Sequence, residues 1–184
     1  PMAEGRLLAE GLKTINAIDA CSKPVVAAVN GMALGGGCEL CLACHIRIAS
    51  TEAVFGQPEI NLGIIPGWGG THRLPQLIGD ARAREWLMTA RNISADEALQ
   101  AGLVCQVVAP EELMNAARKL AAILAAKPPV AMRETLRVLR QRALRPELGQ
   151  ELERAGFEAA ARSKDAAEGV TAFLEKRKPD FTGE

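Results

Sequence analysis

The chain has 184 residues, of which 48% are hydrophobic and 24% are charged, with 22 basic and 22 acidic side chains. This length suits one domain with a sizeable core, or a large part of a slightly bigger domain. The even charge balance gives no electrostatic reason to expect a nucleic acid or a membrane as the partner. No apolar run approaches the length of a membrane span, so we expect no transmembrane segment.

The cysteine content indicates a reducing compartment. The number of cysteines is odd, and their spacing does not match the disulfide framework of a small secreted domain. The first residues show neither the basic start nor the apolar stretch of a signal peptide. We therefore expect reduced thiols and a cytoplasmic protein. The five residues are Cys21, Cys38, Cys41, Cys44 and Cys105.

The first expected element is an amphipathic helix, because apolar side chains share one stripe at Leu8, Leu12, Ile15 and Ile18. A domain can begin in this way, and so can a truncated chain; both possibilities stay open. After Lys23-Pro24, the β-branched run 25–29 predicts a strand that is buried on both faces.

The next stretch alternates short regular elements with glycine-rich loops. Residues 32–34 lead into a glycine triplet, Gly35–Gly37, and a short helix is expected over 38–44. The alternation in 45–49 and 53–55 is typical of strands. Residues 56–70 are rich in glycine and proline, which predicts a loop, and loops beside a rigid sheet often carry functional groups.

Helices dominate the rest of the chain. Ser94–Glu97 forms a capping box that starts a helix ended by Gly102, and residues 103–108 read as a strand. Another helix opens at Pro110, and three further helical stretches run to about residue 177. No fixed-period repeat is present. We expect a core over residues 1–125 and a C-terminal helical region over 126–184.

The glycine triplet before a helix is a candidate anion site. Glycine lets the backbone approach a ligand, and the first turn of a helix offers unpaired N–H groups at the positive end of its dipole. Such a site suits a phosphate or a developing oxyanion. The spacing matches neither a dinucleotide fingerprint nor a P-loop. Close packing of a strand and a helix explains the triplet equally well.

Two acidic residues stand among apolar neighbours. Glu39 lies between cysteines and leucines in the first turn of the short helix, and Glu59 lies between Pro58 and Ile60 in the loop. Apolar surroundings raise a carboxyl pKa toward the range of a general acid or base. The pair could divide acid and base roles. The alternative is that both acids are structural.

The cysteine cluster has a metal-binding alternative. Cys41 to His45 matches the haem-attachment spacing C-x-x-C-H, and Cys38, Cys41 and His45 would share one stripe of a helix. A structural zinc needs four ligands, however, and cysteine commonly serves as a small core residue. Core packing is therefore favoured over zinc, an iron–sulfur cluster or haem. Trp68 could line an apolar pocket or cover the core.

Two blocks of this sequence resemble the crotonase, or enoyl-CoA hydratase/isomerase, superfamily. The first block is Lys23–Gly31 followed by Ala33–Leu40, and the second is Phe55–Glu59 followed by Gly63–Thr71. Residues 94–104 and 173–181 also match family patterns. The resemblance implies an α/β, crotonase (ClpP-like) fold of repeated strand–strand–helix (ββα) units. It also implies a C-terminal helical trimerisation region and an N-terminally incomplete chain.

The resemblance also implies a reaction, the hydration of a trans-2-enoyl-CoA to a 3-hydroxyacyl-CoA. Gly36 matches the position that donates one N–H to the oxyanion hole. Glu39 matches the carboxylate that helps activate water, and Glu59 matches the one that delivers a proton to the α-carbon. Having both favours a hydratase over an isomerase. Another acyl-CoA isomerase or lyase, or an inactive truncated oligomerisation module, remains the alternative.

Further implications concern the substrate and the assembly. The substrate would be an acyl-CoA thioester bound by Trp68 and, from the C-terminal helix of a neighbouring subunit, by Phe173 and Lys176, in a homotrimer or a dimer of trimers. No cofactor or metal is expected, because CoA is part of the substrate. His45 and His72 depart from the aspartate and glutamine usual in the family. The segment that supplies the second oxyanion N–H in the family is not present in this chain.

Overall fold

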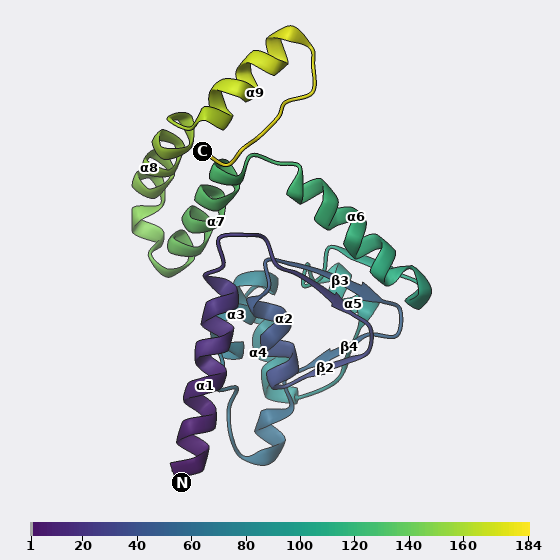
Figure 1. Ribbon diagram of the computed structural model, residues 1–184. Coiled ribbons are helices and arrows are strands. Elements are labelled where there is room, and N and C mark those ends of the chain that lie inside the picture. Colours follow the sequence, from purple (N-terminus) through teal and green to yellow (C-terminus); the bar gives the residue numbers. More distant parts are fainter. Residues whose placement is uncertain (1) are drawn as a thin grey trace. The chain divides into compact units, whose positions relative to one another are not determined.

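The computed structural model describes residues 2–184; Pro1, where the expected core range begins, lies outside the described residues (Figure 1). The chain divides into two compact units. The first runs to residue 19 and resumes over 25–119, and the second comprises 20–24 and 120–184. No helix among the described residues is long and apolar enough to cross a membrane.

The first unit contains the sheets and the helices that cover them. Its elements, in chain order, are α1 (Met2–Asp19), β1 (Val26–Val29), β2 (Met32–Leu34), α2 (Gly36–Ala43), β3 (Ile46–Ser50), β4 (Val54–Gly56), η1 (Pro58–Leu62), α3 (Gly70–Ile78), α4 (Asp80–Thr89), β5 (Ile93–Ser94), α5 (Ala95–Gln100), β6 (Gln106–Val108), η2 (Pro110–Glu112) and the start of α6 (Leu113–Ala125).

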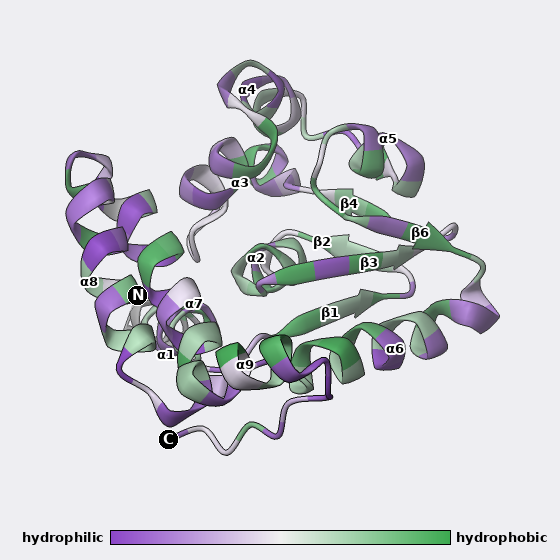
Figure 2. Cartoon of the chain, turned by 90° about the horizontal axis from the view of Figure 1, so that it is seen from above, coloured by the Kyte–Doolittle hydropathy of each residue, from purple (hydrophilic) through white to green (hydrophobic). Residues whose placement is uncertain are grey.

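The strands form two small sheets with the orders β1-β3-β6 and β2-β4-β5. β1 and β3 are parallel, with Val26 opposite Ile46 and Val29 opposite Ala49. β2 and β4 are also parallel, while β5 runs antiparallel to β4. β1 and β2, and then β3 and β4, thus lie in different sheets before the helices that follow them, which confirms the predicted ββα units. Figure 2 shows β1 as hydrophobic throughout, but of its four residues only Val29 is buried and the other three are half-buried, so the predicted burial of both faces is only partly realised.

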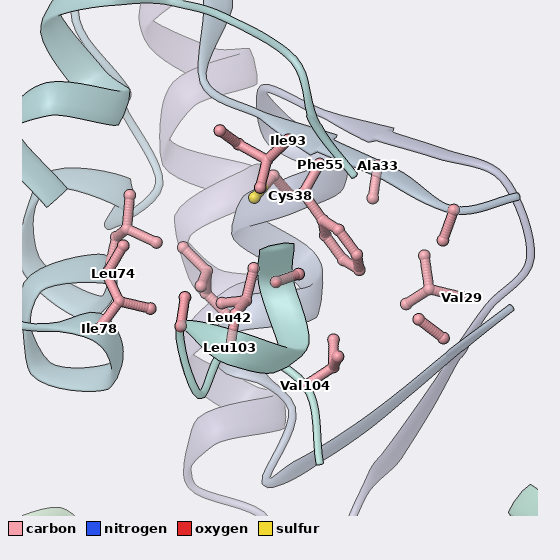
Figure 3. Close-up of a cluster of buried hydrophobic side chains, with 14 of the residues drawn as sticks. Val29, Ala33, Cys38, Leu42, Phe55, Leu74, Ile78, Ile93, Leu103 and Val104 are labelled. Carbon is pink, nitrogen blue, oxygen red and sulfur yellow. The ribbon is translucent and has the colours of Figure 1, made fainter. Parts of the chain in front are cut away.

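The core of this unit lies between the strands and the helices α2 to α5. Cys38 of α2 is 2% exposed and belongs to the same buried cluster as Phe55, Ile93 and Leu103 (Figure 3). Burial raises the pKa of the Cys38 thiol to about 12, so this group stays protonated and behaves as a small apolar side chain.

A buried arginine joins α2 to the segment that precedes β6. The Arg47 guanidinium donates to the main-chain carbonyls of Cys41 and Cys44, at the C-terminal end of α2, and to Leu103 O at 2.7 Å. Burial lowers the pKa of Arg47. The hydrogen bonds to carbonyls compensate part of the cost of removing this charge from water.

The second unit holds three further helices, as predicted: α7 (Pro129–Leu144), α8 (Gly149–Ala161) and α9 (Lys164–Glu175), with η3 (Pro146–Leu148) between the first two. α7 packs against α8, where a Cβ atom on Gly156 would lie 2.7 Å from Val138 Cγ2. Asp165 is buried and accepts the N–H groups of Thr182 at 2.7 Å and Gly183 at 2.9 Å. These two bonds attach the C-terminal segment to α9.

Some boundaries differ from expectation. The short helix expected over 38–44 begins two residues earlier, at Gly36. The strand expected over 103–108 spans only Gln106–Val108. Leu103 and Val104 instead donate their N–H groups to Ala98 O, at 2.8 and 3.3 Å, and so complete the C-terminal turn of α5. The apolar stripe of α1 buries Ile15, whereas Leu8 and Leu12 are exposed.

Candidate active site

Glu39 is held in the first turn of α2 by a tight turn after β2. Gly35 has φ +54°, a left-handed value that favours glycine, and its N–H donates to Gly56 O at 2.9 Å. Glu39 is 3% exposed. Its Oε1 accepts the backbone N–H groups of Trp68 at 2.7 Å and Gly70 at 2.8 Å. Both bonds fall on one oxygen, which sets the direction of the other oxygen, Oε2.

Gly36 begins α2, so its backbone N–H has no acceptor within the helix. A Cβ atom on Gly36 would lie 2.5 Å from Cζ3 of the Trp68 indole, whereas one on Gly37 would meet nothing within 4 Å. Different physical constraints therefore explain why glycine occupies each of the three positions. Backbone conformation requires Gly35, and close approach of the indole requires Gly36. No contact requires Gly37.

Glu59 follows β4 in η1 and is 9% exposed. Burial raises the pKa of its carboxyl, and the negative charge of Glu39 raises it further. With its amide turned so that Nε2 faces the carboxylate, Gln57 donates to both Glu59 oxygens at 3.1 Å. Glu59 also lies against the turn before α2, because a Cβ atom on Gly35 would lie 3.1 Å from Glu59 Oε1.

The two carboxylates share one neighbourhood through Gly70 and Gln57. The N–H of Gly70 donates to Glu39, and a Cβ atom on Gly70 would lie 2.9 Å from the Gln57 amide nitrogen position. Gln57 in turn contacts Glu59. The structure therefore brings the predicted residues Gly36, Glu39 and Glu59 together. The negative charge of Glu39 thus acts on the pKa of Glu59 across this shared neighbourhood.

Trp68 lies half-buried between α1 and α2. Its indole N–H donates to Leu8 O at 3.2 Å, and its ring contacts the backbone at Gly11 and Gly36. Phe173 and Lys176 belong to the second unit, in and at the end of α9. The Phe173 side chain is 82% exposed, and Lys176 has φ +55°.

Three features of the site were not predicted: Gln57, Gly11 and the backbone N–H groups of residues 68 and 70. The sequence contains a weak signal for Gln57, because a polar residue directly after a strand and two positions before Glu59 can reach the Glu59 carboxylate. The sequence also contains a weak signal for Gly11, because glycine is disfavoured inside a helix and often marks close packing. The backbone donors have no signature in the sequence.

The predicted metal-binding alternative gains no geometric support. Among the side chains that the structure describes, no group of three or more His, Cys, Asp or Glu is placed to hold a metal ion. His45 Nδ1 accepts the N–H of Val25 at 2.9 Å, and burial lowers the pKa of His45. A neutral imidazole with Nδ1 as acceptor fits this bond, so His45 fixes the chain before β1.

Comparison with known proteins assigns the chain to a family. A model of the enoyl-CoA hydratase/isomerase family matches residues 3–184. The chain is 47% identical over 177 residues to a crotonyl-CoA hydratase of Syntrophomonas wolfei, covering 93% of this chain and 66% of that protein. It is 46% identical over 170 residues to a short-chain-enoyl-CoA hydratase of Clostridium acetobutylicum, covering 91% and 65%.

Solved structures agree. An enoyl-CoA hydratase from Bacillus anthracis superposes with a TM-score of 0.96 at 40% identity, covering all of this chain and 72% of that one. The chain thus spans about two thirds of the length of the curated relatives it matches. Since the family model and these relatives cover nearly every residue, the chain belongs to the enoyl-CoA hydratase/isomerase family of the crotonase superfamily.

Proposed function

We propose that the protein containing this chain hydrates a trans-2-enoyl-CoA thioester to a 3-hydroxyacyl-CoA. The observation that carries the proposal is the pair of buried carboxylates that share one neighbourhood beside the first turn of α2. Adding water to a conjugated thioester needs a base for the water, a donor for the developing oxyanion, and an acid for the α-carbon. Glu39, Gly36 and Glu59 have the chemistry for these three roles.

The two carboxylates are held differently, which supports different roles. Oε1 of Glu39 is occupied by two backbone N–H groups, so Oε2 is the oxygen that takes a proton from the attacking water. The water oxygen bonds to the β-carbon, and electrons move onto the thioester oxygen beside the Gly36 N–H. Glu59, whose pKa is raised by burial, carries a proton more readily near neutral pH and delivers it to the α-carbon.

The proposed substrate is a short-chain acyl-CoA, by analogy with the relatives named for crotonyl-CoA and short-chain enoyl-CoA. Trp68, Phe173 and Lys176 are the proposed substrate contacts. The reaction transfers no electrons, so we propose no cofactor beyond the CoA of the substrate. The five cysteines are all free thiols, which supports a reducing, cytoplasmic location.

A homotrimer, or a dimer of trimers, is the proposed assembly. The second unit exposes large apolar side chains on α8 and α9, and such side chains gathered on a surface are typical of a protein interface. These side chains are Phe157, Val170, Phe173 and Leu174. Light scattering of the protein that contains this chain would give its mass, and a monomer would contradict this part of the proposal.

The test is an assay of that protein with crotonyl-CoA. Hydration removes the ultraviolet absorbance of the conjugated thioester, and mass spectrometry identifies a product heavier by one water. Glu39→Gln and Glu59→Gln are each expected to lower kcat by roughly 10²- to 10⁴-fold. Glu52→Gln, the same change at an exposed glutamate, serves as the control and keeps the wild-type rate.

Two results would contradict the proposal. One is double-bond migration with no hydrated product on any chain length tested. The other is wild-type turnover in either glutamine variant at the proposed carboxylates.

A further inference from the structure

The Trp68 side chain fits between two glycines that belong to different helices. A Cβ atom on Gly11 of α1 would lie 2.2 Å from Trp68 Cε2, and one on Gly36 of α2 would lie 2.5 Å from Cζ3. Both distances are shorter than any real Cβ contact. The indole therefore rests directly on the backbone of both helices.

The glycine at position 11 lowers the stability of α1. Glycine inside a helix is less favourable than alanine by roughly 0.5–1 kcal/mol. The three atoms nearest to a Cβ atom on Gly11 would all belong to the Trp68 indole, at 2.2 to 2.4 Å. The indole also donates its N–H to Leu8 O at 3.2 Å. One turn of α1 therefore provides both the space for the indole, at Gly11, and the acceptor for its N–H, at Leu8.

Other contacts attach the same loop to α1. Arg73 donates to Trp68 O at 3.0 Å and to Asn16 Oδ1 at 3.3 Å, and it pairs with Asp19 at 3.6 Å. A Cβ atom on Gly67 would lie 2.7 Å from Leu8 Cδ1, so this residue also approaches α1 closely. The loop over 66–70 is thus attached to α1 on both sides of the indole.

The backbone of the same tryptophan holds Glu39. The Trp68 N–H donates to Glu39 Oε1 at 2.7 Å, and the Gly70 N–H, two residues later, donates at 2.8 Å to the same oxygen. A shift of the indole therefore moves the N–H groups that orient the carboxylate. Displacements of about 1 Å at a reacting group can cost roughly 100-fold in rate.

We propose that Trp68 is a positioning residue, seated by Gly11 of α1, that holds Glu39 in its productive orientation. The activity part of this inference rests on the proposed function. It is distinct from a substrate contact, because Trp68 acts here through the direction of Glu39 Oε2. α1 thereby becomes part of the site without contributing a side chain that touches substrate.

The test compares Gly11→Ala with Ala17→Gly in the protein that contains this chain. Gly11→Ala forces the indole to move, whereas Ala17→Gly weakens the same helix at an exposed position without adding any atom beside the indole. We expect Gly11→Ala to lower kcat by roughly 10- to 100-fold, whereas a substrate contact alone would change only KM. Ala17→Gly is expected to lower the melting temperature and leave kcat unchanged.

A double-mutant cycle separates positioning from general damage. In the Glu39→Gln background, Gly11→Ala is expected to cause no further loss of kcat, because both changes act on one carboxylate. Independent, multiplying losses would overturn the proposal, as would a rise in KM at constant kcat. If Gly11→Ala fails to fold, Trp68→Phe replaces it, since phenylalanine is smaller and loses both the N–H bond to Leu8 O and the second ring that contacts Gly11 and Gly36.

Hydrogen exchange gives a readout that does not depend on turnover. The Gly70 amide is expected to exchange at least about tenfold faster in Gly11→Ala than in Ala17→Gly. The reason is that the displaced loop weakens the hydrogen bond from the Gly70 N–H to Glu39 Oε1. This result in a protein without hydratase activity would support the positioning role while refuting the proposed function. Equal exchange in the two variants would overturn the positioning role itself.

Discussion

Replacing Glu39 by alanine removes the carboxylate oxygen that accepts the N–H groups of Trp68 and Gly70. A hydrogen bond to a charged group contributes about 1.5–3 kcal/mol net, so two such bonds amount to about 3–6 kcal/mol. Water entering the vacated space recovers part of this, which leaves an expected loss of about 3 kcal/mol. Glu39→Gln keeps an acceptor oxygen and loses only the charge, so we expect a loss of about 1 kcal/mol.

Urea unfolding followed by circular dichroism measures this difference as a shift of the midpoint at constant slope. Glu52→Ala is the control, because Glu52 is exposed and its truncation is expected to stay within about 0.5 kcal/mol of wild type. If Glu39→Ala costs less than about 1 kcal/mol at unchanged slope, the two bonds do not hold the loop. Glu39 would then not stabilise the fold through its bonds to Trp68 and Gly70.

Three further predictions follow from single positions. Because burial raises the pKa of Glu59 above its ordinary value of 4.5, its ionisation opposes folding. Glu59→Gln is therefore expected to melt above wild type at pH 7, and this advantage shrinks as pH falls through the carboxyl's titration; an advantage that grows toward acid would contradict it. A Cβ atom on Gly70 would lie 2.8 Å from Pro66 Cβ, so Gly70→Ala is expected to lose about 1–3 kcal/mol in urea unfolding, whereas Gly37→Ala, which meets nothing, loses none. Ala90 and Lys176 have φ of +52° and +55°, so glycine at either position is expected to gain about 0.5–1 kcal/mol by calorimetry. Only the Lys176 change is expected to weaken acyl-CoA binding in titration calorimetry, and equal binding would refute that proposed contact.

Local signals in the sequence predicted the regular elements well. Ser94 caps α5, where its hydroxyl accepts the Glu97 N–H at 3.2 Å, as the capping box indicated. The β-branched run before Asn30 forms β1. These features depend on neighbours within a few positions, so a single sequence contains the information that sets them.

The errors at element ends have a physical cause. Leu103 and Val104 have the composition of a strand, but their N–H groups find a closer acceptor in Ala98 O. Gly36 and Gly37 are poor helix formers, but their place in the first turn of α2 avoids the cost of a helix interior. Tertiary context overrides propensity in both cases.

The candidate site was only partly predictable for a related reason. Glu39 and Glu59 could be identified from their apolar neighbours and from the family motifs. Their partners could not, because the bonds from Trp68 and Gly70 span 29 and 31 positions and use backbone donors that every residue type has. Gln57 and Gly11 acquire meaning only once α1, α2 and the 66–70 loop are packed together.

The buried Arg47 has an electrostatic consequence for the opposite end of α2. Its charge lies at the C-terminal carbonyls of this eight-residue helix, about 12 Å from the first turn at 1.5 Å per residue. There it offsets the negative end of the helix dipole. At an effective dielectric constant of about 20, a unit charge at this distance stabilises an anion at the first turn by on the order of 1 kcal/mol. A residue outside the site thus adds to the positive potential at Gly36, where the proposed enolate oxygen would develop its charge.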